Sequence, residues 1–200
     1  MTPQNPMNPM YRLDNAALDK NNPQKSRPTR RLPGNVPYVV DNLWEWVRPA
    51  PFPSRRHCVC ASPKAELAQE FGGSSAGTVF QVTQIVGGKI AQIKQQDAKL
   101  HDEARTLHKT LLKLLDSNWL SNAPLAQKEA IAPLWMPCLS RDEVESLFIK
   151  IPRLAKIKKD LIAEIQFWNE AKIAPLNGPW PFDDGEIFFE AESWELQPYL

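Results

Sequence analysis

Three short segments, spread over most of the chain, each carry one polar side chain in a strand-like context. The side chains are those of Arg12, Ser62 and Glu186. A guanidinium can bind a pyrophosphate through paired hydrogen bonds, a hydroxyl can orient a carboxylate, and a carboxylate can stabilise a cationic sugar. The three residue types therefore suit chemistry on a sugar that is linked to a pyrophosphate. The segments are Tyr11-Arg12-Leu13-Asp14, the run from Arg55 to Pro63, and Asp184-Gly185-Glu186-Ile187-Phe188-Phe189.

Each of these three residues also has an ordinary structural explanation. Arg12 can form an ion pair at a strand edge, and Ser62 can cap a helix. Glu186 can be one of several solvent-facing acids, and the Glu-x-Glu pair of Glu190 and Glu192 competes with it for a catalytic role. We prefer Glu186 because it opens the predicted strand instead of lying inside it. The order arginine, serine, glutamate favours one shared role over three unrelated ones.

The strands that must position these side chains come from both ends of the chain. Residues 55–61 predict a strand, and Ser62-Pro63 predicts a helix start with the serine at the N-cap. That helix is expected to end at Gly72-Gly73. Thr78–Val86 alternates as a strand that Gly87-Gly88 ends, and residues 186–199 alternate as the terminal strands.

Helices are predicted for the middle of the chain and for one earlier segment. Apolar residues recur at spacings of three and four, first at Leu100, Ala104, Leu107, Leu111 and Leu114, then from Leu154 to Trp168 with a start near Pro152. Ser140 and Glu143 form a capping box, and Asp41 or Asn42 is expected to cap a short helix within residues 39–47. Short strands that frame a helical middle section predict the α+β class.

The three polar segments resemble the motifs of mono-ADP-ribosyltransferases of the cholera- and pertussis-toxin-like class. In that family a first strand carries Tyr-Arg-x-Asp, a later strand ends in Ser-Thr-Ser before a helix, and a glutamate opens a third strand. Arg12, Ser62 and Glu186 match these positions. The resemblance implies a split β-sheet core with a helical middle section, and catalytic roles for these three residues. It also implies that Tyr11, Arg12, Asp14 and Ser62 bind NAD⁺.

The sequence departs from the family pattern at two places. Pro63 and Lys64 stand where the family has Thr and Ser, and Asp184 stands where it commonly has Glu or Gln. The residue at the position of Asp184 helps such enzymes to choose and activate the acceptor. The resemblance therefore implies a role in target recognition for Asp184.

The residue types fit the chemistry that the resemblance implies. The bond between nicotinamide and ribose in NAD⁺ breaks with oxocarbenium character, and nicotinamide leaves as a neutral ring that needs no general acid. A Glu186 carboxylate hydrogen-bonded to the ribose 2′-hydroxyl would stabilise the developing positive charge. Ser62 is expected to donate a hydrogen bond to that carboxylate, and Arg12 to bind a phosphate oxygen bidentately, which lysine cannot reproduce.

The expected activity is transfer of ADP-ribose from NAD⁺, the co-substrate, to a protein or nucleic-acid acceptor, as in bacterial toxins, effectors or anti-phage factors. An antitoxin or immunity protein is an expected partner. One alternative is an NAD-degrading hydrolase or RES-type toxin, because residues 61–68 also resemble the helix start of that related fold. A second alternative is a binding module without enzymatic activity that uses basic residues on RNA or on an acidic protein.

Composition limits the other possibilities. The 200 residues carry a formal net charge of +1, which gives no overall attraction to nucleic acid or anionic lipid. Three cysteines and three histidines form neither an even disulfide framework nor an HExxH motif, so no metal is expected and the buried interpretation is preferred for Cys58 and Cys60. Without a signal-like start or a membrane-length apolar run, we expect a cytoplasmic protein or one exported without a cleaved signal.

Domain organisation and two basic segments complete the expectations. Residues 1–9, with three prolines, predict a flexible tail, and residues 10–200 predict a single domain. Residues 15–37 form a long basic loop that is either a solvated excursion or a flap near an anionic ligand. A run without intervening acids, made of Lys150, Arg153, Lys156, Lys158 and Lys159, is typical of a solvated helix face and can alternatively meet an acidic partner or RNA.

Overall fold

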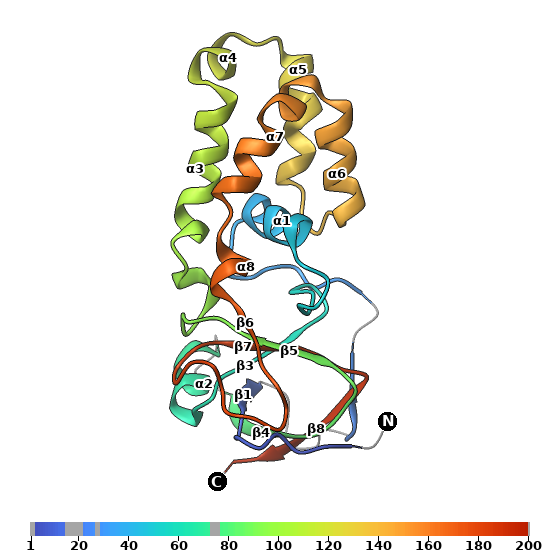
Figure 1. Ribbon diagram of the computed structural model, residues 1–200, viewed down its shortest axis with the longest axis vertical. Helices are drawn as coiled ribbons and strands as arrows, with labels where there is room; N and C mark the ends of the chain where they lie inside the picture. Colours follow the sequence, from blue (N-terminus) through green and yellow to red (C-terminus); the bar gives the residue numbers. More distant parts are fainter. Residues whose placement is uncertain (1–2, 15–21, 27–28, 73–76, 200) are drawn as a thin grey trace. The chain divides into compact units, whose positions relative to one another are not determined.

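The computed structural model describes residues 3–14, 22–26, 29–72 and 77–199 (Figure 1). It contains both helices and antiparallel strands, in agreement with the predicted mixed α and β composition. The chain divides into two compact units. We call them the strand unit, comprising Met1–Arg30, Ala50–Ala98 and Glu170–Leu200, and the helical unit, comprising Arg31–Pro49 and Lys99–Asn169.

The strand unit contains two four-stranded antiparallel sheets. The first has the order β1-β4-β8-β2, formed by β1 (Tyr11–Asp14), β4 (Thr78–Val86), β8 (Ser193–Pro198) and β2 (Gln24–Lys25). The second has the order β3-β7-β5-β6, formed by β3 (Val59–Ala61), β7 (Ile187–Glu190), β5 (Lys89–Gln92) and β6 (Lys172–Ile173). The predicted strand Thr78–Val86 is confirmed. The terminal strands are β7 and β8.

Two short connections link the sheets. In one, β4 leads into β5 through Gly87 and Gly88, whose φ angles of 57° and 145° are conformations that favour glycine. In the other, β7 leads into β8, and in both connections the chain passes from one sheet to the other. Because β4 pairs with β8 and β5 pairs with β7, the two bent segments lie antiparallel to each other and form one continuous curled structure.

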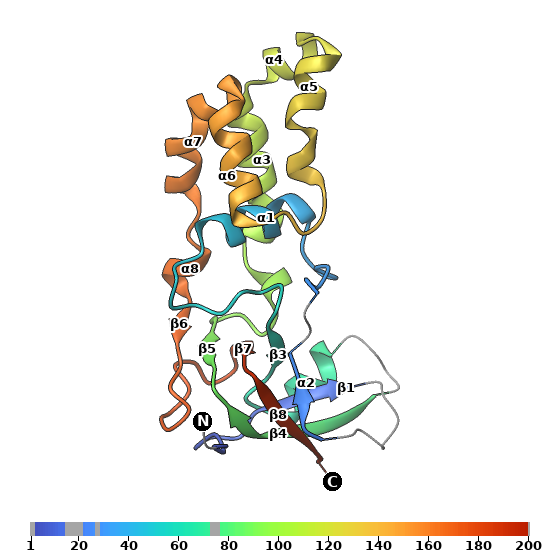
Figure 2. The same ribbon diagram turned by 90° about the vertical axis from the view of Figure 1, so that its right-hand side faces the viewer.

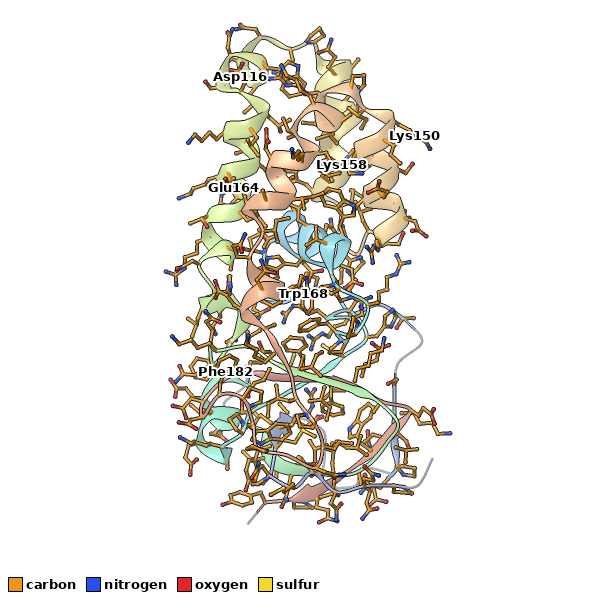
Figure 3. All side chains as sticks on the ribbon, in the orientation of Figure 1. Asp116, Lys150, Lys158, Glu164, Trp168 and Phe182 are labelled. Atoms are coloured by element: carbon orange, nitrogen blue, oxygen red, sulfur yellow. The ribbon has the colours of Figure 1, made fainter. Side chains whose placement is uncertain are left out.

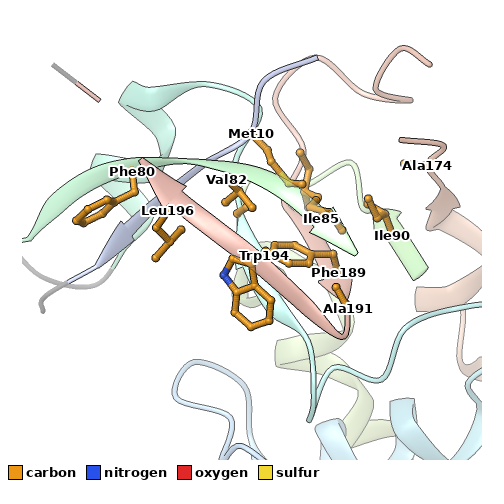
Figure 4. Close-up of a cluster of buried hydrophobic side chains, with 12 residues drawn as sticks. Met10, Phe80, Val82, Ile85, Ile90, Ala174, Phe189, Ala191, Trp194 and Leu196 are labelled. Carbon is orange, nitrogen blue, oxygen red and sulfur yellow. The ribbon is translucent and has the colours of Figure 1, made fainter. Parts of the chain in front are cut away.

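A cluster of buried apolar side chains forms the core of the strand unit (Figure 4). Phe80, Val82 and Leu196 come from the first sheet, and Ile187 and Phe189 from the second. The Phe189 and Trp194 rings meet edge to face with centroids 5.4 Å apart. Alternate residues of each strand thus point into one shared core, which fixes which face the intervening residues occupy.

The segment around Ser62 differs from the prediction. Only Val59–Ala61 of the predicted strand 55–61 is a strand, because residues 55–57 form a turn. Helix α2 (Ala65–Phe71) has its N-cap at Lys64, so the prediction that Ser62 caps this helix was wrong. Both backbone groups of Ser62 are hydrogen-bonded to Tyr11 instead, which extends the strand pairing beyond β3. A Ser-Pro pair can stand at the start of a helix or at the end of a strand. The sequence could not decide between the two because Tyr11, the strand-pairing partner of Ser62, is distant in the chain.

The helical unit contains α1 and most of the helices from the middle of the chain (Figure 2). The predicted capping box of Ser140 and Glu143 and the predicted helix start at Pro152 are confirmed. Helix α1 begins after Pro37, so Asp41 and Asn42 lie inside it and do not cap it. The helical segments are α1 (Tyr38–Val47), η1 (Ala98–Leu100), α3 (Glu103–Leu115), α4 (Ser117–Asn122), α5 (Leu125–Ile131), η2 (Ala132–Trp135), α6 (Arg141–Lys150), α7 (Pro152–Glu164) and α8 (Phe167–Glu170).

The apolar stripes of α3 and α7 form much of the core of the helical unit. Leu107, Leu111, Leu154 and Leu161 are buried, as their spacing predicted. Leu100 precedes α3 and is 38 % exposed, so it does not belong to the stripe. These helices pack against each other along their lengths, and α6 and α1 complete the bundle.

Buried polar side chains also join distant parts of the helical unit. The Glu103 carboxylate accepts hydrogen bonds from the Trp44 indole N–H, at 2.7 Å, and from the backbone N–H of Gln166. The Trp44 ring stacks on Phe167 with centroids 4.0 Å apart. Glu103 therefore connects α1, α3 and the segment that follows α7, and each group has a hydrogen-bond partner in the buried environment.

The ends and long loops of the chain bear on the remaining predictions. Gln4 pairs with Ile85, and the Met7 N–H donates to the Leu176 carbonyl, so part of the predicted tail is hydrogen-bonded to the strand unit. The chain forms two compact units, and whether residues 10–200 act as a single domain stays a prediction. Residues 15–21 and 27–28 of the predicted basic loop lie outside the described residues. Within the described ranges, no helix has the length and apolarity needed to cross a membrane.

Candidate functional site

Backbone pairing brings the three predicted site positions onto neighbouring strands of the strand unit. Tyr11 and Ser62 exchange two backbone hydrogen bonds, of 2.8 and 2.7 Å, next to Arg12. On the other side of β3, Ala61 lies in register with Ile187 of β7. Continuing this register by one residue places Ser62 opposite Glu186. The ends of β1, β3 and β7 therefore lie side by side, with the three residues at this junction.

Arg12 is held by groups at this junction. Its Nη1 donates a hydrogen bond to the Cys60 carbonyl at 3.0 Å, and its Nε lies 3.5 Å from the Asp14 carboxylate. The ion pair between Arg12 and Asp14 is thus present, and the guanidinium also connects β1 to β3. Arg12 lies in register with Phe80, a core residue of β4, so it leaves β1 on the face that carries the core of that sheet.

Glu186 is fixed through both its backbone and its side chain. Its N–H donates to the Gln95 carbonyl at 2.7 Å, and its carbonyl accepts from the Ile93 N–H at 3.1 Å. Its Oε2 accepts a hydrogen bond from the Ala98 N–H at 2.8 Å and lies 3.9 Å from Nη1 of Arg55. Both Glu186 and Arg55 are buried. The Ala98 N–H therefore orients the carboxyl group, and the Arg55 guanidinium places a positive charge close to it without a hydrogen bond from Nη1.

The surroundings raise the pKa of Glu186 well above its ordinary value. The largest cause is burial, which disfavours the charged form, and the Cys60 thiol and Asp97 act in the same direction. Arg55 lowers the pKa because its positive charge favours the carboxylate. The charged form of Glu186 thus depends on Arg55 to offset part of the cost of burial.

The turn before Glu186 is fastened by Gln92 of β5. The Gln92 side-chain amide donates to the carbonyls of Phe182 and Gly185, both at 2.8 Å, and accepts from the Phe182 N–H at 2.9 Å. Gly185 has no room for a side chain, because a Cβ there would lie 1.8 Å from the Ile93 carbonyl oxygen. The close approach of the turn to the end of β5 sets the position at which β7 begins.

The side chains of the three predicted residues are only partly brought together. Ala61 and Ile187 point into the core, so Ser62 and Glu186 lie on the opposite face of their strands. Among the described residues, no hydrogen bond joins the Ser62 hydroxyl to Glu186, and no hydrogen bond or ion pair joins Arg12 to Glu186. Cys60 connects them instead. Its carbonyl accepts from Arg12, and its thiol is among the groups that raise the pKa of Glu186.

Tyr11, which the resemblance placed in NAD⁺ binding, packs against the other end of the chain. The rings of Tyr11 and Tyr199 meet edge to face with centroids 4.8 Å apart. Burial, the nearby Tyr199 and the negative charge of Glu66 raise the pKa of Tyr11. The backbone of Tyr11 thus belongs to the strand junction, and its ring contacts Tyr199 near the end of the chain.

The two positions that depart from the family pattern are paired with each other. The Lys64 ammonium forms an ion pair with the Asp184 carboxylate at 2.5 Å. The hydrogen bond and charge of Asp184 raise the pKa of Lys64. Both side chains are about half exposed, so the pair lies at the surface near the start of α2 and the turn before Glu186.

Sequence reasoning missed Arg55 and Asp97 as neighbours of Glu186. A signal existed for Arg55, because Arg55-Arg56 begins the segment that ends in Ser62, but nothing in the sequence indicated that Arg55 is buried. The rival candidate Glu190 has a structural partner, since its carboxylate accepts a hydrogen bond from the Ser54 N–H at 3.0 Å. Within the described part of the chain, no group of three or more His, Cys, Asp or Glu residues is arranged to hold a metal ion.

Comparison with known proteins adds no relative to these observations. No protein-family model, curated protein or solved structure matches this chain. The function is therefore inferred from the geometry of the strand junction and from the chemistry of its side chains.

Proposed function

We propose that this protein is an NAD⁺-dependent mono-ADP-ribosyltransferase with Arg12, Ser62 and Glu186 as its working residues. The observation that carries the proposal is the pairing of Ser62 with Tyr11, next to the pairing of the adjacent residue Ala61 with Ile187 at the start of β7. An arginine, a serine and a glutamate from three distant segments thereby come to one strand junction. The predicted split-sheet fold of this enzyme class belongs to the same proposal.

In the proposed reaction, NAD⁺ loses nicotinamide from C1′ of its ribose. The C1′–N bond breaks, and its electron pair leaves with nicotinamide, which departs as a neutral ring. A nucleophilic atom of the acceptor then forms a bond to C1′ and releases its proton to solvent. The Glu186 carboxylate accepts a hydrogen bond from the ribose 2′-hydroxyl and stabilises the positive charge that develops on the sugar.

Arg12 is proposed to bind the pyrophosphate or a ribose-phosphate oxygen. Its side chain is 30 % exposed in the ion pair with Asp14, so part of the guanidinium remains open to solvent. Its planar set of donors suits phosphate oxygens. Ser62 borders both Tyr11 and Glu186, and its proposed role is to orient the carboxylate when substrate is bound. Asp184, paired with Lys64 at the surface, is proposed to contribute to target recognition.

The test is to incubate the full chain with NAD⁺ labelled in its adenylate part and a whole-cell lysate. Wild-type protein is expected to transfer label to macromolecules, and Glu186→Gln to reduce the rate by about 10²–10³-fold, the usual loss for a preorganised electrostatic group. Digestion of the products with protease or with nuclease then distinguishes protein from nucleic-acid acceptors. Glu70→Gln, which removes an exposed acid of α2, is the matched control and should keep full activity.

Other outcomes would change the assignment. Loss of activity in Glu190→Gln but not in Glu186→Gln would move the catalytic role to the rival carboxylate. Free ADP-ribose without a labelled acceptor would favour an NAD-degrading hydrolase. Salt-sensitive RNA binding without NAD⁺ turnover, unchanged in Glu186→Gln, would favour a binding module.

The biological context belongs to the same proposal. An enzyme that transfers ADP-ribose to macromolecules would act as a toxin, effector or anti-phage factor, in the cytoplasm of its own cell or of a target cell. A protective antitoxin or immunity protein would then be its partner. Transfer that stops when such a protein is added would support this context.

A further inference from the structure

We propose that Arg55 acts through Glu186, as the buried positive charge that keeps its carboxyl group in the ionised form that ADP-ribosyl transfer requires. The inference rests on the proposed function and extends it to a residue that the sequence resemblance does not include. It is carried by the buried ion pair of these two side chains, in which Nη1 of Arg55 lies 3.9 Å from Oε2 of Glu186.

Burial makes this pair consequential. The Arg55 side chain is 4 % exposed and that of Glu186 is 9 % exposed, so water screens their interaction little. A buried carboxylate without an opposite charge nearby loses most of its hydration and takes up a proton instead. Arg55 supplies the opposite charge that favours the ionised form of the Glu186 carboxyl group.

The position of Arg55 is itself fixed by neighbouring groups. Its guanidinium lies over the Phe188 ring, 5.8 Å from the centroid, and Phe188 is on the same face of β7 as Glu186. Its carbonyl accepts a hydrogen bond from the Cys58 thiol at 3.3 Å, next to β3. Arg55 is thus held by contacts with β7, which begins directly after Glu186, and with the segment that leads into β3.

The remaining groups around the carboxyl act with or against Arg55. The Cys60 thiol from β3 and Asp97 from the segment after β5 raise the pKa of Glu186, and Arg55 lowers it. The Ala98 N–H donates to the same Oε2 that faces Arg55. Removing the guanidinium should therefore shift the titration of Glu186 to higher pH. An opposite charge at this range typically moves a carboxyl pKa by about 1–3 units.

The experiment follows the Glu186 carboxyl carbon by NMR over a pH titration of the full chain, with the signal assigned through Glu186→Gln. In Arg55→Gln the midpoint should rise by about 1–3 pH units. Arg55→Lys should restore part of the shift because it keeps the charge. Arg48→Gln removes an arginine that is paired with Glu45 in the helical unit, and it should leave the midpoint in place. An unchanged midpoint in Arg55→Gln would overturn the proposal.

A measurement on the wild-type protein covers the case in which Arg55→Gln does not fold. The guanidinium signals of Arg55 should shift with the same midpoint as the Glu186 carboxyl, because the two groups are in contact. Arg55 signals that do not respond to this titration would also overturn the proposal.

Activity provides an independent readout. In Arg55→Gln, kcat near neutral pH should fall by up to about tenfold for each unit by which the midpoint rises, and it should recover at higher pH, while KM for NAD⁺ changes little. A loss that is equal at every pH would indicate a structural role only and would contradict the proposal. Absence of transfer by the wild type would instead refute the proposed enzyme, and the NMR arm would still decide the role of Arg55.

Discussion

Glu186, the proposed catalytic residue, occupies an environment that opposes its charged form in the folded state. Its carboxyl accepts a backbone hydrogen bond from Ala98 and faces Arg55, yet burial dominates and raises its pKa. A residue chosen only for stability at this position would be neutral or apolar. The cost of keeping an acid here is consistent with a role in chemistry, as expected where pKa values are strongly shifted.

Replacement of this acid should therefore become more favourable for stability as the pH rises. Above the ordinary pKa of a glutamate, the folded state binds more protons at Glu186 than the unfolded state does, so stability falls as the pH rises toward the raised pKa. Glu186→Gln removes this dependence, although it also removes the buried ion pair with Arg55. The difference in melting temperature between Glu186→Gln and the wild type should therefore shift in favour of the variant from pH 5 to pH 8, with about 2–4 °C for each kcal/mol in a chain of this size.

Thermal melts over a pH series measure this effect, with Glu192→Gln as the control for loss of one exposed charge. The control should follow the wild-type curve. A Glu186→Gln variant that is destabilised by the same amount at every pH would contradict the assigned pKa shift.

The junction of β1, β3 and β7 depends on how closely the turn before β7 approaches the end of β5. Gln92 fastens this turn through Phe182 and Gly185, and Glu186 continues the pairing through Ile93 and Gln95. The position of the catalytic candidate is thus set by an element on the far side from β3. The contact between this turn and the end of β5 should leave no space for a side chain at Gly185.

Gly185→Ala should accordingly damage the junction. The added methyl group would lie 1.8 Å from the Ile93 carbonyl oxygen, so the backbone must shift, at a cost of about 1–3 kcal/mol. Denaturant unfolding would measure the loss, and the transfer assay should show reduced activity. Gly34→Ala is the matched control, because a Cβ at Gly34 has open space around it. Equal stability of the two variants would show that the turn adapts without strain.

The sequence predicted elements better than it predicted their contacts. Thr78–Val86, the capping box at Ser140 and the helix start at Pro152 follow from local patterns and were confirmed. The position of Ser62 depends on its pairing with Tyr11, and the position of Arg55 depends on its burial beside Glu186. Both partners are distant in the chain. Local propensity cannot contain such information, because the same residues serve equally well as a helix cap or as a surface arginine.

The basic run on α6 and α7 shows the same limit at the scale of the helical unit. Lys150 and Lys158 of this run are labelled in Figure 3. Lys158 is paired with Glu145, and the Arg153 guanidinium donates a hydrogen bond to the Leu115 carbonyl and lies over the Trp119 ring, 5.3 Å from the centroid. Two of the five basic residues thus serve the internal structure of the unit. The remaining charge is small for a polyanion-binding face, which weakens the argument for the binding-module alternative.

Each of the two units has a core of its own, which should make their local stabilities separable. Leu161 lies in the core of the helical unit and Leu196 in the core of the strand unit, and both side chains are buried. Truncation of a buried leucine to alanine costs about 2–5 kcal/mol. Leu161→Ala should speed amide exchange more in α3, α6 and α7 than in β4 and β8, whereas Leu196→Ala should do the reverse. Hydrogen exchange measured by mass spectrometry resolves these segments. If both variants raised exchange equally in both units, the chain would open as one cooperative body, and a disturbance in the helices would then reach the strand junction as global unfolding.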